Sequence, residues 1–147
     1  MQLIVHATDG SPEAADALAV AMDLAKDTGA QLVVVSVHIV HPGGKGLSPP
    51  ITEVEQRHGA EHLAEAATAT ARAAGIDARA YVATGDPAKE IIHIAEEVGA
   101  DLIVVGSRGF GAVRGALFGS VSRALVGRSK IPVTVVTQRG VREPAHV

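Results

Sequence analysis

The strongest chemical signal in the sequence is a glycine-rich segment, residues 106–122, whose last part carries two serines. Its five glycines are Gly106, Gly109, Gly111, Gly115 and Gly119. Glycine lets the backbone approach an anion closely, and the N–H groups at the start of a following helix attract negative charge. Ser120 and Ser122 add hydroxyl donors there. We therefore predict a phosphate site; the alternative is a surface loop with a serine helix cap.

Asp9 is a second candidate, because it lies in a short polar segment, residues 8–11, directly after an apolar run. An aspartate in this position either contacts a ligand or accepts hydrogen bonds from the amides of its own turn. Arg108 and Arg114 have a similar ambiguity, since each can brace phosphate groups or remain solvated on the surface. The residues alone leave these alternatives open.

The charge is unevenly distributed along the chain. The formal net charge is -3, which disfavours a general nucleic-acid binder, because such proteins hold the phosphate backbone with an excess of Lys and Arg. Residues 102–147 nevertheless contain seven basic and one acidic side chain. The last third of the chain therefore favours a small anionic ligand.

Patterns typical of catalysis are missing. The sequence has no cysteine, which excludes thiolate catalysis, disulfides and cysteine-ligated metals. It has neither the Lys-Ser or Lys-Thr pair of a P-loop nor the Gly-x-Ser-x-Gly of a nucleophile elbow. His58 and His62 have the spacing of a metal pair on a helix, but no ligand from another segment accompanies them. We therefore predict no catalytic and no metal-ligating residue.

The elements that position these residues alternate between short apolar runs and helical stripes. The predicted strands are residues 2–7, 31–39, 78–84, 102–105 and 132–137. The predicted helices begin after Ser11, Thr52 and Asp86, each a capping residue, and a short fourth helix covers about residues 120–128. This alternation predicts an α/β fold, an open doubly wound parallel sheet with helices on both faces.

We expect one domain over residues 1–147, because this length suits a single core. No apolar run reaches the roughly 20 residues that cross a bilayer, so no membrane association is expected, and the absence of cysteine fits a cytoplasmic location. In doubly wound sheets the ligand lies beyond the carboxyl ends of the strands, where the strand order reverses. Residues 7–11 and 106–109 follow two such strands and are expected to face each other.

Gly106, Gly109, Gly119 and Ser120 together resemble the phosphate-binding motif of the universal stress protein family: glycine, two residues, glycine, nine residues, glycine, then serine or threonine. The segments 8–11, 84–87, 100–106 and 131–136 also resemble the family in order and spacing. The resemblance covers nearly the whole chain. One departure is Ala7, where some ATP-binding members carry proline.

The resemblance implies five strands in the order 3-2-1-4-5 and a bound ATP, accompanied by Mg²⁺ that the phosphates and water hold. Its phosphates would lie on residues 106–122, Asp9 would serve the ribose and base, and Val37 and Val105 would line the adenine slot. The residues expected at the nucleotide are Ala7, Asp9, Val37, Val105, Gly106, Arg108, Gly109, Gly119, Ser120, Val121 and Ser122.

The function implied by the resemblance is that of an ATP-binding, nucleotide-responsive regulatory module in stress response, with at most slow ATP hydrolysis. It also implies a homodimer formed through the last strand, Val133–Val136, and a protein partner of unknown identity. Three alternatives remain: an interaction dimer of the same fold that binds no nucleotide, an enzyme such as a genuine ATPase or a nucleotide transferase of a related α/β fold, and a protein that binds cyclic AMP.

Overall fold

The computed structural model describes residues 1–39, 53–108 and 119–137, and strands alternate with helices throughout them. The strands are β1 (Leu3–Ala7), β2 (Gln31–His38), β3 (Ala78–Thr84), β4 (Leu102–Gly106) and β5 (Val133–Val136). The helices are α1 (Pro12–Thr28), α2 (Glu53–Ala73), α3 (Pro87–Val98) and α4 (Ser120–Arg128). The predicted strand bounds agree with these to within one residue. Thr52, the predicted cap of the second helix, lies outside the described residues.

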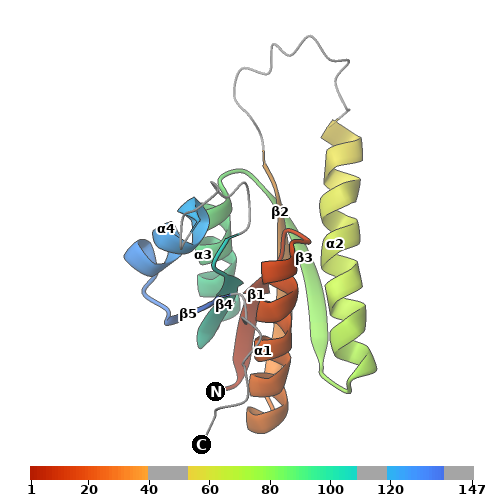
Figure 1. Ribbon diagram of the computed structural model, residues 1–147, viewed down its shortest axis with the longest axis vertical. Coiled ribbons are helices and arrows are strands. Elements are labelled where there is room, and N and C mark those ends of the chain that lie inside the picture. The colour runs from red at the N-terminus through yellow and green to blue at the C-terminus, as the bar shows by residue number, and fades with distance from the viewer. Residues whose placement is uncertain (40–52, 109–118, 138–147) are drawn as a thin grey trace, which may run out of the picture.

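The five strands form one parallel sheet in the order β3-β2-β1-β4-β5, which confirms the predicted fold class and strand order. β1 is central: Val5 is paired with Val33 of β2 on one side and with Ile103 of β4 on the other. In Figure 1, α1 and α2 lie on one side of the sheet and α3 and α4 on the other. The chain therefore winds first toward β3 and then toward β5, and reverses between β1 and β4.

Two apolar clusters, one on each face of the sheet, form the core. On the α3 and α4 face, Val5, Val33 and Ile103 pack with Ile91 and Leu125. The opposite cluster relies on alanines of α1 and α2, whose small side chains let the helices approach the strands. Because the central strands are covered on both faces, their sequences are almost continuously apolar. No helix in the described part of the chain is long and apolar enough to cross a membrane.

Local sequence fixes the ends of α1. The hydroxyl oxygen of Ser11 accepts a hydrogen bond from the amide of Ala14 at 3.1 Å, and Pro12 occupies the first helical position. Gly29 ends the helix with a φ of +75°, a left-handed conformation that favours glycine. The start of α1 is thus placed at the carboxyl end of β1, where the candidate site lies.

Candidate functional site

The reversal of strand order brings the segments after β1 and β4 side by side. His6 of β1 is paired with Val104 of β4, so Ala7, the last residue of β1, lies at about the level of Val105, one residue before the end of β4. Residues 8–11 follow β1 directly, and residues 107–108 follow Gly106, the last residue of β4. This is the crevice in which doubly wound sheets bind ligands, and it is the place that the sequence predicted for the two segments.

A small hollow lies between these segments and the start of α4. Its lining consists of Ala7, Asp9, Ser11, Ala14, Val105, Gly106, Val121 and Ser122. Six of these were predicted site residues, while Ser11, which caps α1, and Ala14, in the first turn of α1, were not. The cavity has a volume of about 10 Å³, room for about one water molecule. A larger ligand would have to lie above these residues.

The remaining predicted residues surround the hollow or lie away from it. Val37 is buried near the end of β2, in the same core cluster as Ala7 and Val105, but does not line the hollow. Gly119 is buried at the capping position of α4, and Ser120 is exposed at the first position of this helix. Arg108 is partly exposed after β4. Gly109 and the rest of the segment 109–118 lie outside the described residues.

Asp9 forms the turn that its sequence context predicts. One carboxylate oxygen accepts a hydrogen bond from the amide of Ser11 at 2.9 Å, and the hydroxyl oxygen of Thr8 accepts one from Gly10 at 3.1 Å. Gly10 has a φ of +79°, which an L-residue rarely adopts. One carboxylate oxygen of Asp9 thus has the role in the turn that the sequence suggested. A contact between Asp9 and a ligand stays a prediction.

Ser107, which sequence reasoning did not single out, connects three elements at this site. Its amide donates a hydrogen bond to the carbonyl of Val136 in β5 at 2.9 Å, and its carbonyl accepts one from the amide of Gly119 at 2.6 Å. The hydroxyl of buried Ser122 lies 2.9 Å from the Ser107 carbonyl and 3.0 Å from that of Gly119. The one proton of this hydroxyl is therefore held by main-chain carbonyls, and Ser122 fixes the start of α4.

One part of the hollow, the start of α4, favours an anion, although the carboxylate of Asp9 also lines the hollow. The first turns of α1 and α4 both line it, but the amide of Ala14 in α1 already donates a hydrogen bond to the Ser11 hydroxyl. Unpaired N–H groups and partial positive charge are therefore expected at the start of α4. The start of α4 has Gly119 in the capping position, so no capping side chain accepts its amides. Arg108 adds a positive charge nearby, and its guanidinium lies 3.7 Å from the carboxylate of Glu13 in the first turn of α1.

Metal binding finds no support in the described ranges, where no group of three or more candidate ligands is found. His58 lies 3.4 Å from Glu61 on the exposed face of α2. The side chain of His58 is 70% exposed. The described residues that line the hollow contain neither a catalytic Ser-His-Asp triad nor a pair of carboxylates for general acid–base catalysis.

A parallel, doubly wound sheet with an anion-attracting hollow at its reversal point defines a class of α/β domains that bind small ligands beyond their strand ends. Residues 1–137 match the model of the Universal stress protein family. The chain belongs to this family. One relative, Universal stress protein YxiE of Bacillus subtilis, is 34% identical over 145 residues that cover 88% of this chain and 95% of the relative.

Two similar structures contain nucleotides. A universal stress protein solved in complex with cAMP is 29% identical with a TM-score of 0.71, covering 92% of this chain and 96% of that one. The universal stress protein from Archaeoglobus fulgidus in complex with dAMP is 26% identical with a TM-score of 0.69, covering 92% and 98%. The family resemblance stated from the sequence is confirmed.

Proposed function

We propose that the chain binds ATP above the hollow between β1, β4 and α4, and acts as a nucleotide-responsive regulatory module in stress response. The observation that carries the proposal is the uncapped N-terminus of α4 at a hollow that Gly106 helps to line, at the reversal point of the sheet. The cAMP and dAMP complexes of similar proteins support an adenine nucleotide as the ligand.

In this proposal the phosphates lie against the start of α4, with Ser120 donating a hydroxyl hydrogen bond. Ser122 has a positioning role, because its hydroxyl proton is already held by the carbonyls of Ser107 and Gly119. Ala7, Val37 and Val105 share one apolar cluster at the strand ends, which suits the adenine ring. Mg²⁺ would be held mainly by phosphate oxygens and water, and we expect at most slow hydrolysis.

Calorimetric titration of nucleotide-free protein with magnesium–ATP tests the proposal. Gly119→Val adds a branched side chain at the buried start of α4, and we expect it to weaken ATP binding at least tenfold. Gly59→Val, on the exposed face of α2 where an added Cβ would meet nothing within 4 Å, is the matched control. One ATP per chain, lost only in Gly119→Val, is the supporting result.

ADP and cyclic AMP titrations separate the alternatives. If the protein binds cyclic AMP more tightly than ATP, cyclic AMP replaces ATP as the proposed ligand. The cAMP complex of a similar protein is the reason for testing this nucleotide. If millimolar ATP produces neither heat nor thermal stabilisation, the chain is an interaction protein of the same fold. Circular dichroism of both variants establishes that they are folded.

We also propose a homodimer formed through β5 and a cytoplasmic location. β5 is hydrogen-bonded to β4 on one side and ends the described sheet, so its other edge offers main-chain groups to a second strand. Beside this edge, Val126, Val133 and Val135 line an apolar groove between α4 and β5. A second copy of the chain would cover both features.

A further inference from the structure

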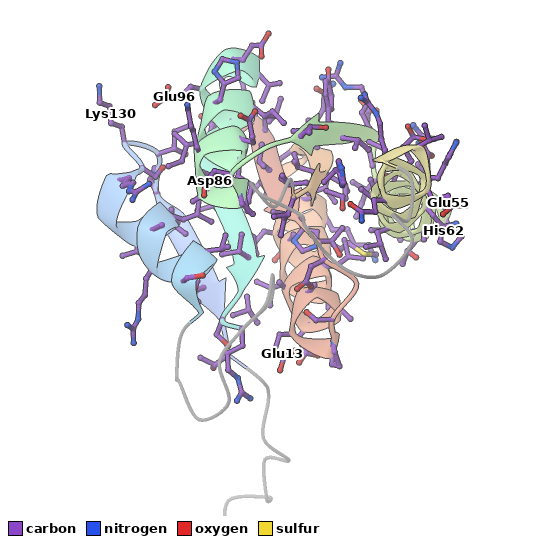
Figure 2. The ribbon with its side chains drawn as sticks, turned by 90° about the horizontal axis from the view of Figure 1, so that it is seen from above. Glu13, Glu55, His62, Asp86, Glu96 and Lys130 are labelled. Atoms are coloured by element: carbon purple, nitrogen blue, oxygen red, sulfur yellow. The ribbon has the colours of Figure 1, made fainter. Side chains whose placement is uncertain are left out.

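The ion pair between Glu13 and Arg108 lies at the edge of the candidate site and joins α1 to the segment after β4. The guanidinium and carboxylate are 3.7 Å apart, and the side chains are 35% and 16% exposed, respectively. Ser11 and Ala14, on either side of Glu13, both line the hollow. Figure 2 shows Glu13 at the end of α1 that lies toward β4 and α4. A carboxylate therefore stands where an anionic ligand would approach.

Main-chain packing fixes the backbone from which this carboxylate extends. A Cβ atom at Gly106 would lie 2.8 Å from the carbonyl carbon of Glu13 and 2.9 Å from its oxygen. Real Cβ atoms essentially never come so close, so the first turn of α1 rests directly on the backbone of Gly106. Arg108 follows two residues later. The backbone of Glu13 is thus held beside the segment that carries Arg108, which keeps the two side chains within reach of each other.

A carboxylate held in this way affects a bound phosphate through two electrostatic effects. It repels the ligand directly, by an amount that grows with the ligand's negative charge. It also competes with the phosphate for Arg108, whose planar guanidinium binds carboxylates and phosphates by the same geometry. Both effects lower the affinity for a phosphate-bearing ligand, and neither acts on an uncharged one.

We infer that Glu13 is an affinity-setting residue that competes with the ligand's phosphates for Arg108 and so weakens the binding of polyphosphate nucleotides. The inference rests on the proposed function, because it assigns a role within the same site. Such a residue would be useful in a regulatory nucleotide sensor. A site whose affinity is too high stays saturated over the whole range of nucleotide concentrations that the sensor has to distinguish.

The test is a set of titrations with ATP and with adenosine, which lacks phosphate, on the wild-type protein and on Glu13→Gln, Arg108→Gln and the double variant. We expect Glu13→Gln to bind ATP about three- to fivefold more tightly, the effect of a partly exposed ion pair, and adenosine within about twofold of wild type. Arg108→Gln should bind ATP more weakly. In the Arg108→Gln variant, the gain in ATP affinity that Glu13→Gln brings should be clearly smaller than in wild type, because the competition for Arg108 is gone.

Asp23→Asn is the matched control, since it removes the same charge from an exposed position of α1 about 15 Å along the helix, and its ATP affinity should equal that of wild type. Tight ATP binding with no gain in Glu13→Gln, or the same gain with and without Arg108, would overturn the inference and leave the proposed function intact. ATP binding that weakens in Glu13→Gln would also overturn it. The absence of ATP binding in every variant, wild type included, would overturn both.

Discussion

His6 carries an imidazole in the middle of the sheet, fully buried in the central strand β1. Its Nδ1 donates a hydrogen bond to the carbonyl of Val104 at 3.0 Å, and its Nε2 has no hydrogen-bond partner among the described residues. Burial lowers the pKa of His6 from 6.5 to about 4, against the smaller opposing effects of the Val104 carbonyl and of Asp9. The side chain is therefore neutral in the folded protein at neutral pH.

This lowered pKa predicts a loss of stability in mild acid. Because the unfolded chain binds a proton at His6 more readily than the folded one, the contribution of His6 is complete above pH 6.5 and is lost as the pH falls toward 4. The loss amounts to about 3 kcal/mol at most, since one pKa unit is worth about 1.4 kcal/mol. Urea denaturation between pH 7 and pH 4 should show this slope in wild type and a shallower one in His6→Gln.

His93→Gln is the control for that series, because His93 is exposed on α3 and its loss should leave the slope as in wild type. If the stability of wild type and of His6→Gln depends on pH with the same slope, the buried neutral His6 is not the cause of the acid sensitivity.

At the scale of single residues the sequence predicted the region of the site better than the role of each side chain. Composition and spacing indicated the segments around Asp9 and around Gly106, and six of the predicted residues do line the hollow. The role of Ser122 depends on where the carbonyls of Ser107 and Gly119 lie, which no local pattern encodes. Glu13 was not singled out from the sequence. Its contact with Arg108 depends on the meeting of two distant segments.

At Gly106, β4 and α1 approach each other so closely that an added Cβ would lie 2.8 Å from a main-chain atom of Glu13, which gives a prediction for this contact. Gly106→Ala should lower the free energy of unfolding by about 1–3 kcal/mol, because the added Cβ meets main-chain atoms that cannot rotate away. Gly59→Ala should instead raise it by up to about 1 kcal/mol, since Gly59 lies in an exposed turn of α2 with nothing near its Cβ position. Chemical denaturation measures both, and equal effects of the two substitutions would contradict the close contact.

At the scale of elements, the sequence predicted what each segment becomes and not which segments are neighbours. Ser11 and Asp86 cap α1 and α3 as expected, each followed by a proline, and Gly29 and Gly99 end these helices. Capping depends on residues within a few positions of one another, so local sequence suffices. The order of the strands depends on contacts between residues about 100 positions apart, such as those of β1 with β4. It therefore came from the family resemblance and not from periodicity.

At the scale of the whole molecule, the proposed dimer predicts the effect of a charge beside β5. Val126 on α4 is 61% exposed and lines the groove next to that strand. Val126→Lys should shift the protein from dimer to monomer in light-scattering chromatography at micromolar concentration, because a desolvated lysine in an apolar interface is costly. Val54→Lys is a closely matched control, since Val54 is 62% exposed on α2, and it should leave the dimer unchanged. A monomeric wild-type protein, or a dimer in both variants, would contradict an interface at β5.

The position of β1 between β2 and β4 has a consequence for the newborn chain on the ribosome. β1 can pair with β2 as soon as His38 has emerged, but its other neighbour begins only at Leu102. Asp101, whose carboxylate accepts hydrogen bonds from the amides of Gln2 and Leu3 at 2.7 and 3.0 Å, arrives equally late. Translation at about 5–20 residues per second takes roughly 3–12 s for the ~60 intervening residues. During that interval the central strand of the finished sheet has one open edge, so nascent chains crowded on a polysome are most exposed to mispairing there.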